Sequence, residues 1–451
     1  MKKGKKPKGI PLPSATISLP RPLKADIRPN KLVFPLTSRW GNLTPAVKSG
    51  DDISEGQLLA MDSRGVAPPI FSPCSGKVTG ITPWTNFSGQ DSPSIIIQCS
   101  SVPQHSTGAK LGVSWREMDI HTLIKKIHKS GIREADSYRW PLAWRLAQPG
   151  LPPVESEHNG PDISRPIDFL IINALDRQPG VFVRQAALGT METEIADSIS
   201  LLERVSGARN TVLAVWKDQH IPDSLETELG QRGINVAMCP NIYPIALEPL
   251  LIRYITGRDV PQPKGDPREV GVVVVDMVTA LRVYRAVRDN QPATNILVQI
   301  NAPAAGIDYQ QWVPEGMLVS ELLDQLPSRP KNTSKLLLGG PFLGFAQHTF
   351  DVPITGNVDS IIIQSLGEVS TFENRACINC GHCVKVCPMG LLPNDLSRLC
   401  EYGKFEAAEK NYLFYCIECG LCAYVCPAKR PMVHFIRFGK QEVERMRETS
   451  Q

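Results

Sequence analysis

The chain repeats one pattern of cysteines, first as Cys377-Ile-Asn-Cys380-Gly-His-Cys383-Val-Lys-Val-Cys387-Pro388 and again as Cys416-Ile-Glu-Cys419-Gly-Leu-Cys422-Ala-Tyr-Val-Cys426-Pro427. Both stretches read C-x2-C-x2-C-x3-C-P, in which three thiolates two residues apart on a tight loop can reach three irons of one cubane. Gly381 and Gly420 give each loop the freedom to wrap around such a cluster. The pattern therefore predicts two [4Fe-4S] clusters in the C-terminal part of the chain.

Structural zinc is the alternative for clustered cysteines. A zinc site takes four ligands, usually from two separated C-x2-C pairs, and would leave the third and fourth cysteines of each run unexplained. The spacing resembles instead that of two-cluster ferredoxins, in which the fourth cysteine of one run binds the other cluster. By this resemblance the first cluster takes Cys377, Cys380, Cys383 and Cys426, and the second takes Cys416, Cys419, Cys422 and Cys387.

The insert between the two runs, residues 393–409, reads as two helices broken at Gly403. It resembles the α-helical ferredoxin domains of respiratory iron–sulfur subunits, which are normally one segment of an electron-transfer chain. Four basic residues flank the cysteines, namely Lys385, Lys429, Arg430 and Lys440. They are either ordinary surface charge or groups that stabilise reduced clusters and dock an acidic electron carrier, and the sequence leaves both interpretations open.

The remaining cysteines are Cys74, Cys99, Cys239 and Cys400. Cys400 lies at helical spacing from Leu396 and Leu399, which predicts a buried thiol. None of the other three has a partner at ligand spacing in the sequence. All four are therefore expected to be ordinary thiols.

The composition is that of a folded chain with no strong charge. Of 451 residues, 42% are hydrophobic, which excludes wholesale disorder. The net charge of +4 is too small for a nucleic-acid-binding surface over the whole protein, so no nucleic-acid partner is expected. The basic N-terminus is followed by Ile10-Pro-Leu-Pro13 rather than by an apolar segment, and the apolar run 270–275 is far too short to span a bilayer. Without a signal peptide or a transmembrane segment, the chain is expected to be cytoplasmic.

The first hundred residues predict a β domain behind a tail. Residues 1–20 are interpreted as a basic tail, either a solvated arm or an arm held to anionic lipid or an acidic partner. Residues 21–105 contain two strand–turn–strand signals, 47–59 and 70–81, and resemble the lipoyl/biotinyl-like barrel-sandwich domain. Lys77 follows Ser75-Gly76 at the start of a predicted strand, not at a hairpin tip, so it is not expected to carry lipoate or biotin.

The central part alternates predicted strands and helices. Apolar runs at 169–172, 211–215 and 270–275 predict buried strands, and 192–205 and 281–287 carry apolar residues at helical spacing. Residues 106–290 are therefore predicted to form an α/β sandwich with a largely parallel sheet. Residues 291–350 predict a small β-grasp (SLBB-like) module, and residues 351–451 the two-cluster ferredoxin domain. The fold class is thus multidomain α/β.

This domain order resembles the C subunits of Rnf-type ion-translocating electron-transport complexes. The stretches that match in order are Val47-Lys-Ser-Gly-Asp51 with Gly56-Gln57, Ser75-Gly-Lys-Val78, Ile255-Thr-Gly-Arg-Asp-Val-Pro261, Gly271-Val-Val-Val274, Tyr284-Arg-Ala-Val287 and Gly339-Gly-Pro341. The resemblance implies a hetero-oligomeric complex in which this subunit lies peripherally on the inner face of the cytoplasmic membrane. It also implies membrane-embedded Rnf-like or cytochrome subunits and a soluble electron carrier as partners, and an α/β domain similar to the FMN- and NADH-binding subunit of complex I.

The nucleotide-type loops depart from that family. Its glycine-rich flavin loop corresponds here to Gly131-Ile-Arg-Glu-Ala-Asp-Ser-Tyr-Arg-Trp-Pro141, which has lost the glycines and gained two acids. Its carboxylate-rich stretch corresponds to Asn173-Ala-Leu-Asp-Arg-Gln-Pro-Gly180, which keeps at most Asp176, and its later Y-P-x-G-A-E to Tyr243-Pro-Ile-Ala-Leu-Glu248. Acidic, bulky residues where a phosphate would lie argue against FMN and NADH binding.

Three functions follow as hypotheses. The first is an electron-transfer iron–sulfur subunit whose α/β domain is a scaffold and docking surface. The second is the standard family role, NADH oxidation through FMN. The third is a non-catalytic redox-sensing or assembly protein. No Ser/His/Asp or paired-carboxylate arrangement in the sequence predicts acid–base or nucleophilic catalysis.

Overall fold

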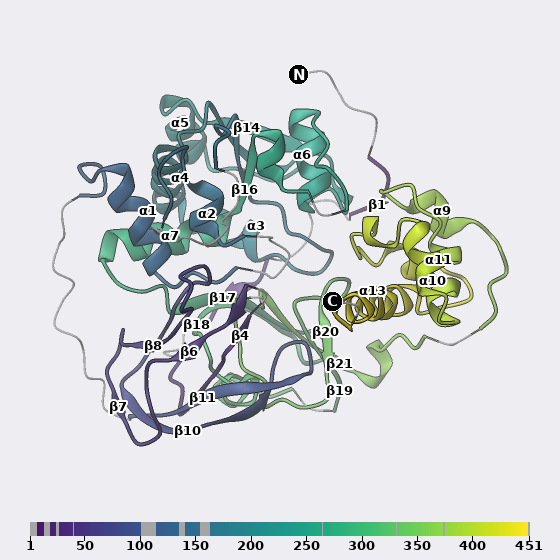
Figure 1. Cartoon of the computed structure of the whole chain (residues 1–451), viewed down its shortest axis with the longest axis horizontal. Coiled ribbons are helices and arrows are strands. Elements are labelled where there is room, and N and C mark those ends of the chain that lie inside the picture. Colours follow the sequence, from purple (N-terminus) through teal and green to yellow (C-terminus); the bar gives the residue numbers. More distant parts are fainter. Residues whose placement is uncertain are drawn as a thin grey trace.

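The computed structural model describes residues 7–12, 19–23, 27–38, 40–100, 114–134, 140–153, 163–263, 265–330, 332–356, 358–372 and 375–449. An α/β block lies above a block of β-sheets, and the helical C-terminal segment lies beside both (Figure 1). No helix in these ranges is long and apolar enough to cross a bilayer.

Two small sheets form the N-terminal β domain. The first has the order β3-β11-β10-β7 and the second the order β6-β8-β9. The strands are β3 (Lys31–Pro35), β4 (Thr37–Ser38), β5 (Gly41–Asn42), β6 (Thr44–Pro45), β7 (Asp52–Ile53), β8 (Leu58–Met61), β9 (Ile70–Phe71), β10 (Gly76–Thr85) and β11 (Asp91–Cys99), with β4 and β5 paired only to each other. β7 and β8 pair into different sheets, and so do β9 and β10. Each predicted strand–turn–strand unit therefore crosses from one sheet to the other.

The predicted parallel sheet is confirmed. Its order is β14-β13-β12-β16, and every neighbouring pair is parallel. The strands are β12 (Phe169–Asn173), β13 (Asn210–Trp216), β14 (Asn235–Cys239) and β16 (Val272–Asp276), and the helices are α1 (Ile120–Lys129), α2 (Leu142–Leu146), α3 (Val183–Leu188), α4 (Glu192–Ser206), α5 (Asp223–Gln231), α6 (Glu248–Thr256) and α7 (Met277–Asp289). Leu170 and Ile172 pack in the core that contains α1, α4 and α7, whereas Ile171 packs in the core that contains α6. Helices on both faces explain why these strands read as continuous apolar runs.

A six-stranded sheet lies below the α/β block (Figure 1). Its order is β2-β18-β17-β21-β19-β20, from β2 (Arg21–Pro22), β17 (Asn295–Ala302), β18 (Ile307–Pro314), β19 (Thr333–Leu338), β20 (Phe345–Gln347) and β21 (Ser360–Ser365), with helix α8 (Val319–Asp324). Short 3-10 helices are Pro267–Val270, Pro303–Ala305, Leu366–Glu368 and Leu413–Tyr415.

This sheet differs from the prediction in one boundary and in its hydrophobic core. β21 pairs with β17 and β19, so the module predicted to end at residue 350 continues through residue 365. The N-terminal β domain and this sheet also share one hydrophobic core, in which Leu32 and Ile97 join Val298 and Ile361. The two predicted modules therefore do not have separate cores, because a thin β layer buries its apolar face only against the next layer.

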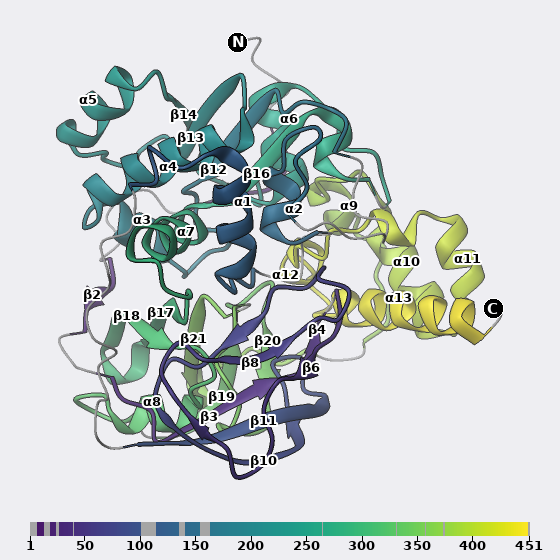
Figure 2. The same ribbon diagram turned by 60° about the vertical axis from the view of Figure 1, so that its left-hand side comes forward.

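The C-terminal segment is helical, as predicted. It contains α9 (His382–Val386), α10 (Pro393–Glu401), α11 (Phe405–Lys410), α12 (Leu421–Tyr424) and α13 (Met432–Thr449). Gly403 separates α10 from α11 at φ +68°, the left-handed conformation that favours glycine. Cys400 belongs to α10 and is fully buried against α13, which confirms the prediction for this thiol. Figures 1 and 2 both place these helices beside α6 and β20.

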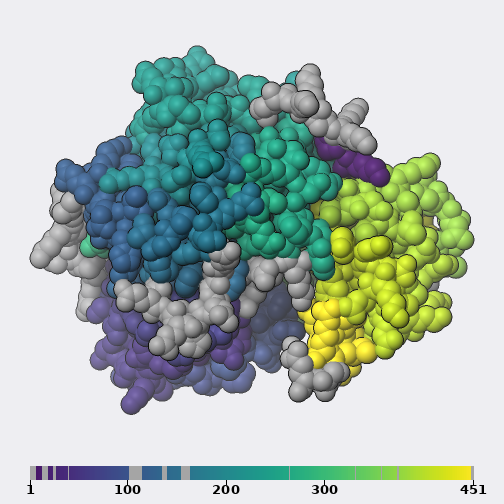
Figure 3. Space-filling model, turned by 45° about the horizontal axis from the view of Figure 1, so that its top comes forward, coloured from purple at the N-terminus to yellow at the C-terminus, as the bar shows by residue number. Residues whose placement is uncertain are grey.

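Part of the predicted solvated tail is instead a strand. β1 (Ile10–Pro11) pairs antiparallel with β15 (Ile242–Tyr243) of the α/β part. In Figure 3 this purple segment lies along the seam between the α/β block and the helical segment. Residues 1–6, which carry most of the tail's lysines, lie outside the described residues.

Candidate functional site

The two cysteine runs line two hollows in the helical segment. The first hollow is lined by Cys377, Cys380, Cys383 and Cys426, together with Ile378, Asn379 and Arg430. The second is lined by Cys387, Cys416, Cys419 and Cys422, together with Met389, Leu396 and Ile436. Each hollow thus takes three cysteines from one run and the fourth from the other, which is the grouping predicted by the resemblance to two-cluster ferredoxins.

The thiols of the second hollow lie in a donor-rich backbone environment. The backbone N–H of Glu418 donates to Cys416 Sγ at 3.4 Å, and those of Leu421 and Ala423 donate to the sulfurs of Cys419 and Cys422. Burial raises the pKa of the Cys419 thiol to about 12, so the thiolate form depends on a bound metal that displaces the proton. Four thiols and inward-facing amides are the donor set of a [4Fe-4S] cluster, which supplies one-electron transfer when bound. Among the described residues no three His, Cys, Asp or Glu side chains converge on a single metal ion.

The two hollows differ in their access to solvent. Cys380 is exposed and Ile378 is 65% exposed at the edge of the first hollow. In the second hollow Cys387, Cys419 and Cys422 are buried. The first hollow therefore has solvent-exposed residues at its edge, whereas the residues that line the second are buried or half-buried.

The α/β domain covers the second hollow through Tyr243. This side chain is 1% exposed, and its Oη donates to the Cys419 carbonyl oxygen at 2.5 Å. Its ring lies 4.9 Å from that of Phe342, which lies 5.4 Å from the ring of Tyr424. A Cβ at Gly420 would lie 2.8 Å from the Phe342 ring, and its φ is +79°, so this position requires glycine.

The glycine-rich loop Gly339–Gly344 closes the same interface. Gln178 of the α/β domain accepts hydrogen bonds from the backbone N–H of Phe342 and of Leu343, at 2.9 and 3.0 Å. Its amide nitrogen donates to the Gly339 carbonyl oxygen. A side chain at Gly340 would collide with Gln178. The close backbone approach that these glycines permit thus serves a contact between domains.

Of the four basic residues that flank the cysteines, two make contacts within the helical segment and two are exposed. Lys440 donates to the Cys416 carbonyl oxygen at 2.7 Å and pairs with Glu418 at 2.6 Å, and the buried Arg430 pairs with Glu401. These two hold the fold of the helical segment together, and neither is surface charge. Lys385 and Lys429 are exposed. Lys429 lies between Ala428 and Arg430, which line the first hollow, and Lys385 is two residues from Cys383 of that hollow and two from Cys387 of the other.

One of the two acids of the predicted flavin loop, Glu134, is buried. Glu134 is 4% exposed and pairs with the buried Arg145 at 2.5 Å. Gly131 has φ +73°, and a Cβ there would lie 2.8 Å from the Pro69 carbonyl oxygen, so this glycine permits packing on the N-terminal β domain. Residues 135–139 of the loop lie outside the described residues. The described part of the loop thus contains a buried carboxylate that is already paired with a cation.

Asp176 belongs to a buried ionic cluster centred on Arg184. The Arg184 guanidinium lies 2.5 Å from Asp276, 3.2 Å from Asp359 and 3.9 Å from Asp176, and its side chain is 3% exposed. The Asp176 carboxylate also accepts the backbone N–H of Arg184 at 2.8 Å. Burial raises the pKa of Asp176 to about 7, although Arg184 opposes this shift. This carboxylate is occupied in holding the start of α3.

Glu248 lies in different surroundings. It begins α6, and its carboxylate lies 3.9 Å from Arg145 Nη1. Burial raises its pKa to about 7. Among the described contacts Asp176 and Glu248 have no ion-pair partner in common, so the structure does not bring these two predicted residues together in one site.

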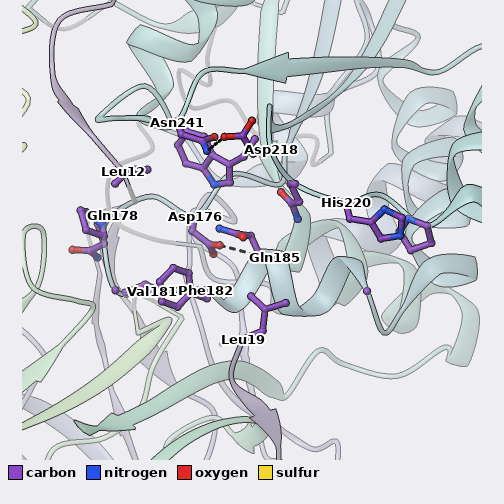
Figure 4. A pocket seen from close by; sticks show the side chains of 16 residues that line it. Leu12, Leu19, Asp176, Gln178, Val181, Phe182, Gln185, Asp218, His220 and Asn241 are labelled. Atoms are coloured by element: carbon purple, nitrogen blue, oxygen red, sulfur yellow. Dashed lines mark hydrogen bonds between the residues drawn. The ribbon is translucent and has the colours of Figure 1, made fainter. Parts of the chain in front are cut away.

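A larger pocket opens at the carboxyl ends of β12 and β13 (Figure 4). It has a volume of about 330 Å³ and is lined by Trp216, Phe182 and Val181 among its apolar residues and by Asp176 and Asp218 as its acids. Among the described residues the lining contains no lysine or arginine, but it contains His220. Two buried carbonyl oxygens in its wall, Gln219 Oε1 and Asn241 Oδ1, have no hydrogen-bond partner in the described part of the chain. These oxygens suit a ligand that donates hydrogen bonds.

The acids of this region would oppose a bound phosphate. They are Glu134 in the flavin loop and Asp176 and Asp218 in the pocket. Arg145 and Arg184 are already paired with buried acids.

Several important contacts have no signal in the sequence. Arg184 meets Asp276 and Asp359, which are 92 and 175 residues away in the chain. Tyr243 and Gln178 lie in the stretches that correspond to cofactor motifs of the family. Only the fold shows that Tyr243 contacts Cys419 of the helical segment and that Gln178 contacts the loop Gly339–Gly344. Cys74 and Cys99, expected to be unpartnered thiols, have sulfurs 2.6 Å apart, which corrects that expectation.

Comparison with protein families finds three matches. Residues 5–101 match the RnfC barrel sandwich hybrid domain, residues 127–285 the Nuo51 FMN-binding domain, and residues 370–427 a 4Fe-4S dicluster domain. The chain is 28% identical over 427 residues to the C subunit of the proton-translocating ferredoxin:NAD(+) oxidoreductase complex of Clostridium ljungdahlii, covering 94% of this chain and 90% of that protein.

Enterobacterial relatives are longer than this chain. The C subunit of the ion-translocating oxidoreductase complex of Serratia proteamaculans is 30% identical over 431 residues, which is 94% of this chain but 59% of that protein. The corresponding protein of Yersinia pseudotuberculosis is 29% identical over 451 residues, which is 62% of its length. Among solved structures, an air-oxidised NAD+-reducing [NiFe]-hydrogenase is 16% identical with a TM-score of 0.47, covering 67% of this chain and 60% of that chain.

Proposed function

We propose that this chain, which resembles the C subunits of Rnf-type ion-translocating oxidoreductase complexes over 94% of its length, is an electron-transfer iron–sulfur subunit of such a complex. The observation that carries the proposal is the pair of hollows, each lined by four cysteines drawn from both runs. We assign one [4Fe-4S] cluster to Cys377, Cys380, Cys383 and Cys426, and the other to Cys387, Cys416, Cys419 and Cys422. Crossed ligation holds the two centres within one small helical unit, and a short separation favours rapid electron transfer between them.

The positions of the two hollows suggest the order in which electrons pass through the two clusters. The first hollow has the exposed Ile378 and Cys380 at its edge, so it exchanges electrons with an outside carrier. The second is covered by Tyr243 and Phe342 and connects inward toward the α/β domain. Exposed Lys385 and Lys429, which lie close in the chain to residues of the first hollow, favour an acidic soluble carrier, such as a ferredoxin.

The other domains act as scaffold and docking surfaces in this proposal. The α/β domain keeps a nucleotide-type fold without FMN or NADH, and residues 291–365 are interpreted as the β-grasp (SLBB-like) module enlarged by β21. By the resemblance, the chain associates peripherally with membrane-embedded Rnf-like or cytochrome subunits on the inner face of the cytoplasmic membrane. The match of residues 127–285 to an FMN-binding domain keeps NADH oxidation as the second candidate function.

Anaerobic reduction separates the two candidates. With NADH, the visible absorbance of the reconstituted full-length chain is expected to stay unchanged, whereas dithionite bleaches it, because no flavin links the nucleotide to the clusters. The denatured supernatant is expected to contain no FMN. Bleaching by NADH together with stoichiometric FMN would establish the second function instead, and clusters that stay redox-silent during turnover of the partner complex would favour a sensing or assembly role.

Reversing the charge beside the first hollow is expected to slow electron exchange. The double variant Lys385→Glu/Lys429→Glu should accept electrons from a reduced acidic ferredoxin about tenfold more slowly at low salt, because electrostatic steering into the exposed hollow is lost. The difference should shrink as salt screens the charges. Stopped-flow absorbance measures the rate.

The matched control changes the same charge on another part of the molecule. Lys48→Glu/Lys77→Glu lies on the N-terminal β domain, where both lysines are exposed. If the two double variants slow the reaction equally, net charge governs the encounter and the proposed docking position is wrong.

A further inference from the structure

Cys74 and Cys99 face each other in the N-terminal β domain, outside both cysteine runs. Cys74 lies between β9 and β10, and Cys99 is the last residue of β11. Their sulfur atoms are 2.6 Å apart, closer than two thiols approach in ordinary packing, and both residues are half-buried. A metal cluster does not account for either thiol, because neither lines a cysteine hollow.

The backbone fixes this meeting of the two sulfurs. Gly76 is paired with Cys99 in the β10–β11 ladder, and a Cβ at Gly76 would lie 2.3 Å from the Gln98 carbonyl oxygen. The Ser100 N–H donates to the Ser75 carbonyl oxygen at 2.8 Å, and the Cys99 N–H donates to the Asn30 carbonyl oxygen at 2.8 Å. On the other side, the Ser72 hydroxyl donates to the Cys74 carbonyl oxygen at 2.6 Å. Both cysteines are therefore held on a rigid frame with their side chains directed at one another.

The contact makes a thiolate accessible within the pair. A thiolate on one sulfur is favoured by the neighbouring thiol, whose own pKa is raised by the same contact and by burial. One sulfur of the pair can therefore attack an oxidant, and the other can resolve the mixed disulfide.

We propose that Cys74 and Cys99 form a reversible disulfide, a covalent modification site that reacts with low-molecular-weight disulfides such as oxidised glutathione. The thiolate of one cysteine attacks one sulfur of the small disulfide, forming a mixed disulfide and releasing one thiol. The other cysteine then loses its proton, attacks the protein sulfur of the mixed disulfide and expels the second thiol. Overall, two protein thiols are oxidised by two electrons, and one small disulfide is reduced to two thiols.

The bond would tie two segments of the β domain together. It would join the β9–β10 connection to the end of β11, closing a loop of the chain that contains all of β10. Cross-links of this kind stabilise a fold mainly by restricting the unfolded chain. The oxidised protein is therefore expected to melt at a higher temperature than the reduced protein.

Peptide mapping of the full-length, cluster-loaded chain tests the proposal. The protein is incubated anaerobically with oxidised glutathione, alkylated with N-ethylmaleimide and digested with trypsin without reductant. The expected product joins the tryptic peptides 65–77 and 78–110, which contain Cys74 and Cys99. Dithiothreitol should abolish it, and Cys239→Ser, a buried thiol in the α/β sheet, should leave it unchanged.

Two variants test the pairing of the sulfurs. In Cys99→Ser and in Cys74→Ser the cross-linked peptide should be absent, and glutathione should accumulate on the remaining cysteine, because no second thiol is left to resolve the mixed disulfide. Both wild-type cysteines fully alkylated after oxidation would overturn the proposed disulfide.

Discussion

Serine in place of Cys426 is expected to halve the iron content of the chain, from about eight to about four atoms, although this cysteine belongs to the second run. It lines the hollow of Cys377, Cys380 and Cys383, so its loss should remove that cluster alone. The cluster in the buried hollow should survive, because its own four cysteines are intact. Iron analysis and low-temperature EPR of the dithionite-reduced protein measure the loss: the spectrum of two interacting [4Fe-4S]⁺ centres should become that of one isolated centre.

Double variants decide between crossed and uncrossed ligation. Cys426→Ser combined with Cys377→Ser should lose no more iron than either single variant, because both residues serve one cluster. Cys426→Ser combined with Cys416→Ser should lose both clusters, although these two residues lie in the same run.

Cys400→Ala is the matched control, since this thiol is buried in the same helical segment and lines neither hollow. It should keep about eight irons. The reverse result for the double variants would mean that each run holds its own cluster, and roughly one zinc with no iron in the wild type would refute the iron–sulfur assignment.

Methionine in place of Arg184 is expected to destabilise the α/β domain by about 3–5 kcal/mol at pH 8, because it removes one cation from among three buried carboxylates. The side chain is 3% exposed and lies between Asp176, Asp276 and Asp359. Methionine fills much of the volume of the arginine side chain. The loss of stability therefore comes more from the uncompensated carboxylates than from lost packing. Urea denaturation followed by circular dichroism measures the change.

The loss of stability caused by Arg184→Met should depend on pH. Burial raises the pKa of Asp176 to about 7, above the unfolded value near 4, so its protonated form is favoured in the folded state. Its contribution to stability is complete at low pH and is lost as pH rises through about 7. Arg184 opposes this rise, and removing it should raise the pKa of Asp176 further. The variant should therefore recover part of its stability at pH 5, where Asp176 binds a proton.

Arg209→Met provides the control in the same domain. Arg209 also pairs with an aspartate, Asp168 at 3.1 Å, but its side chain is 70% exposed. Its loss should cost less than about 1 kcal/mol at either pH, as for other exposed ion pairs. Equal effects of the two substitutions at pH 8 would show that the carboxylates around Arg184 are effectively hydrated.

The elements with a strong local pattern were predictable. The apolar run at β16 and the helical spacing in α4 marked a parallel sheet with helices, because burial on both faces leaves few polar residues in a strand. The boundaries were harder to predict. The sequence predicts that the cysteine-rich domain begins at residue 351, but β21 within this range pairs with β17 and β19 through its buried isoleucines. Pairing between strands that are far apart in the chain cannot be recognised from the local pattern of residues.

The amino-acid sequence by itself determined the chemistry of this protein, since the spacing of eight cysteines sets the number of thiolates and the loops that present them. The loss of glycines from the flavin loop also followed from sequence, because only glycine allows close backbone approach to a phosphate. The tertiary structure alone decided how these parts meet. It left exposed residues at the edge of one hollow and placed the other behind Tyr243, it paired Glu134 with Arg145 and Arg184 with three acids, and it brought Cys74 to Cys99. These contacts join residues far apart in the chain, and their energies arise from burial and charge compensation that exist only after the chain has folded.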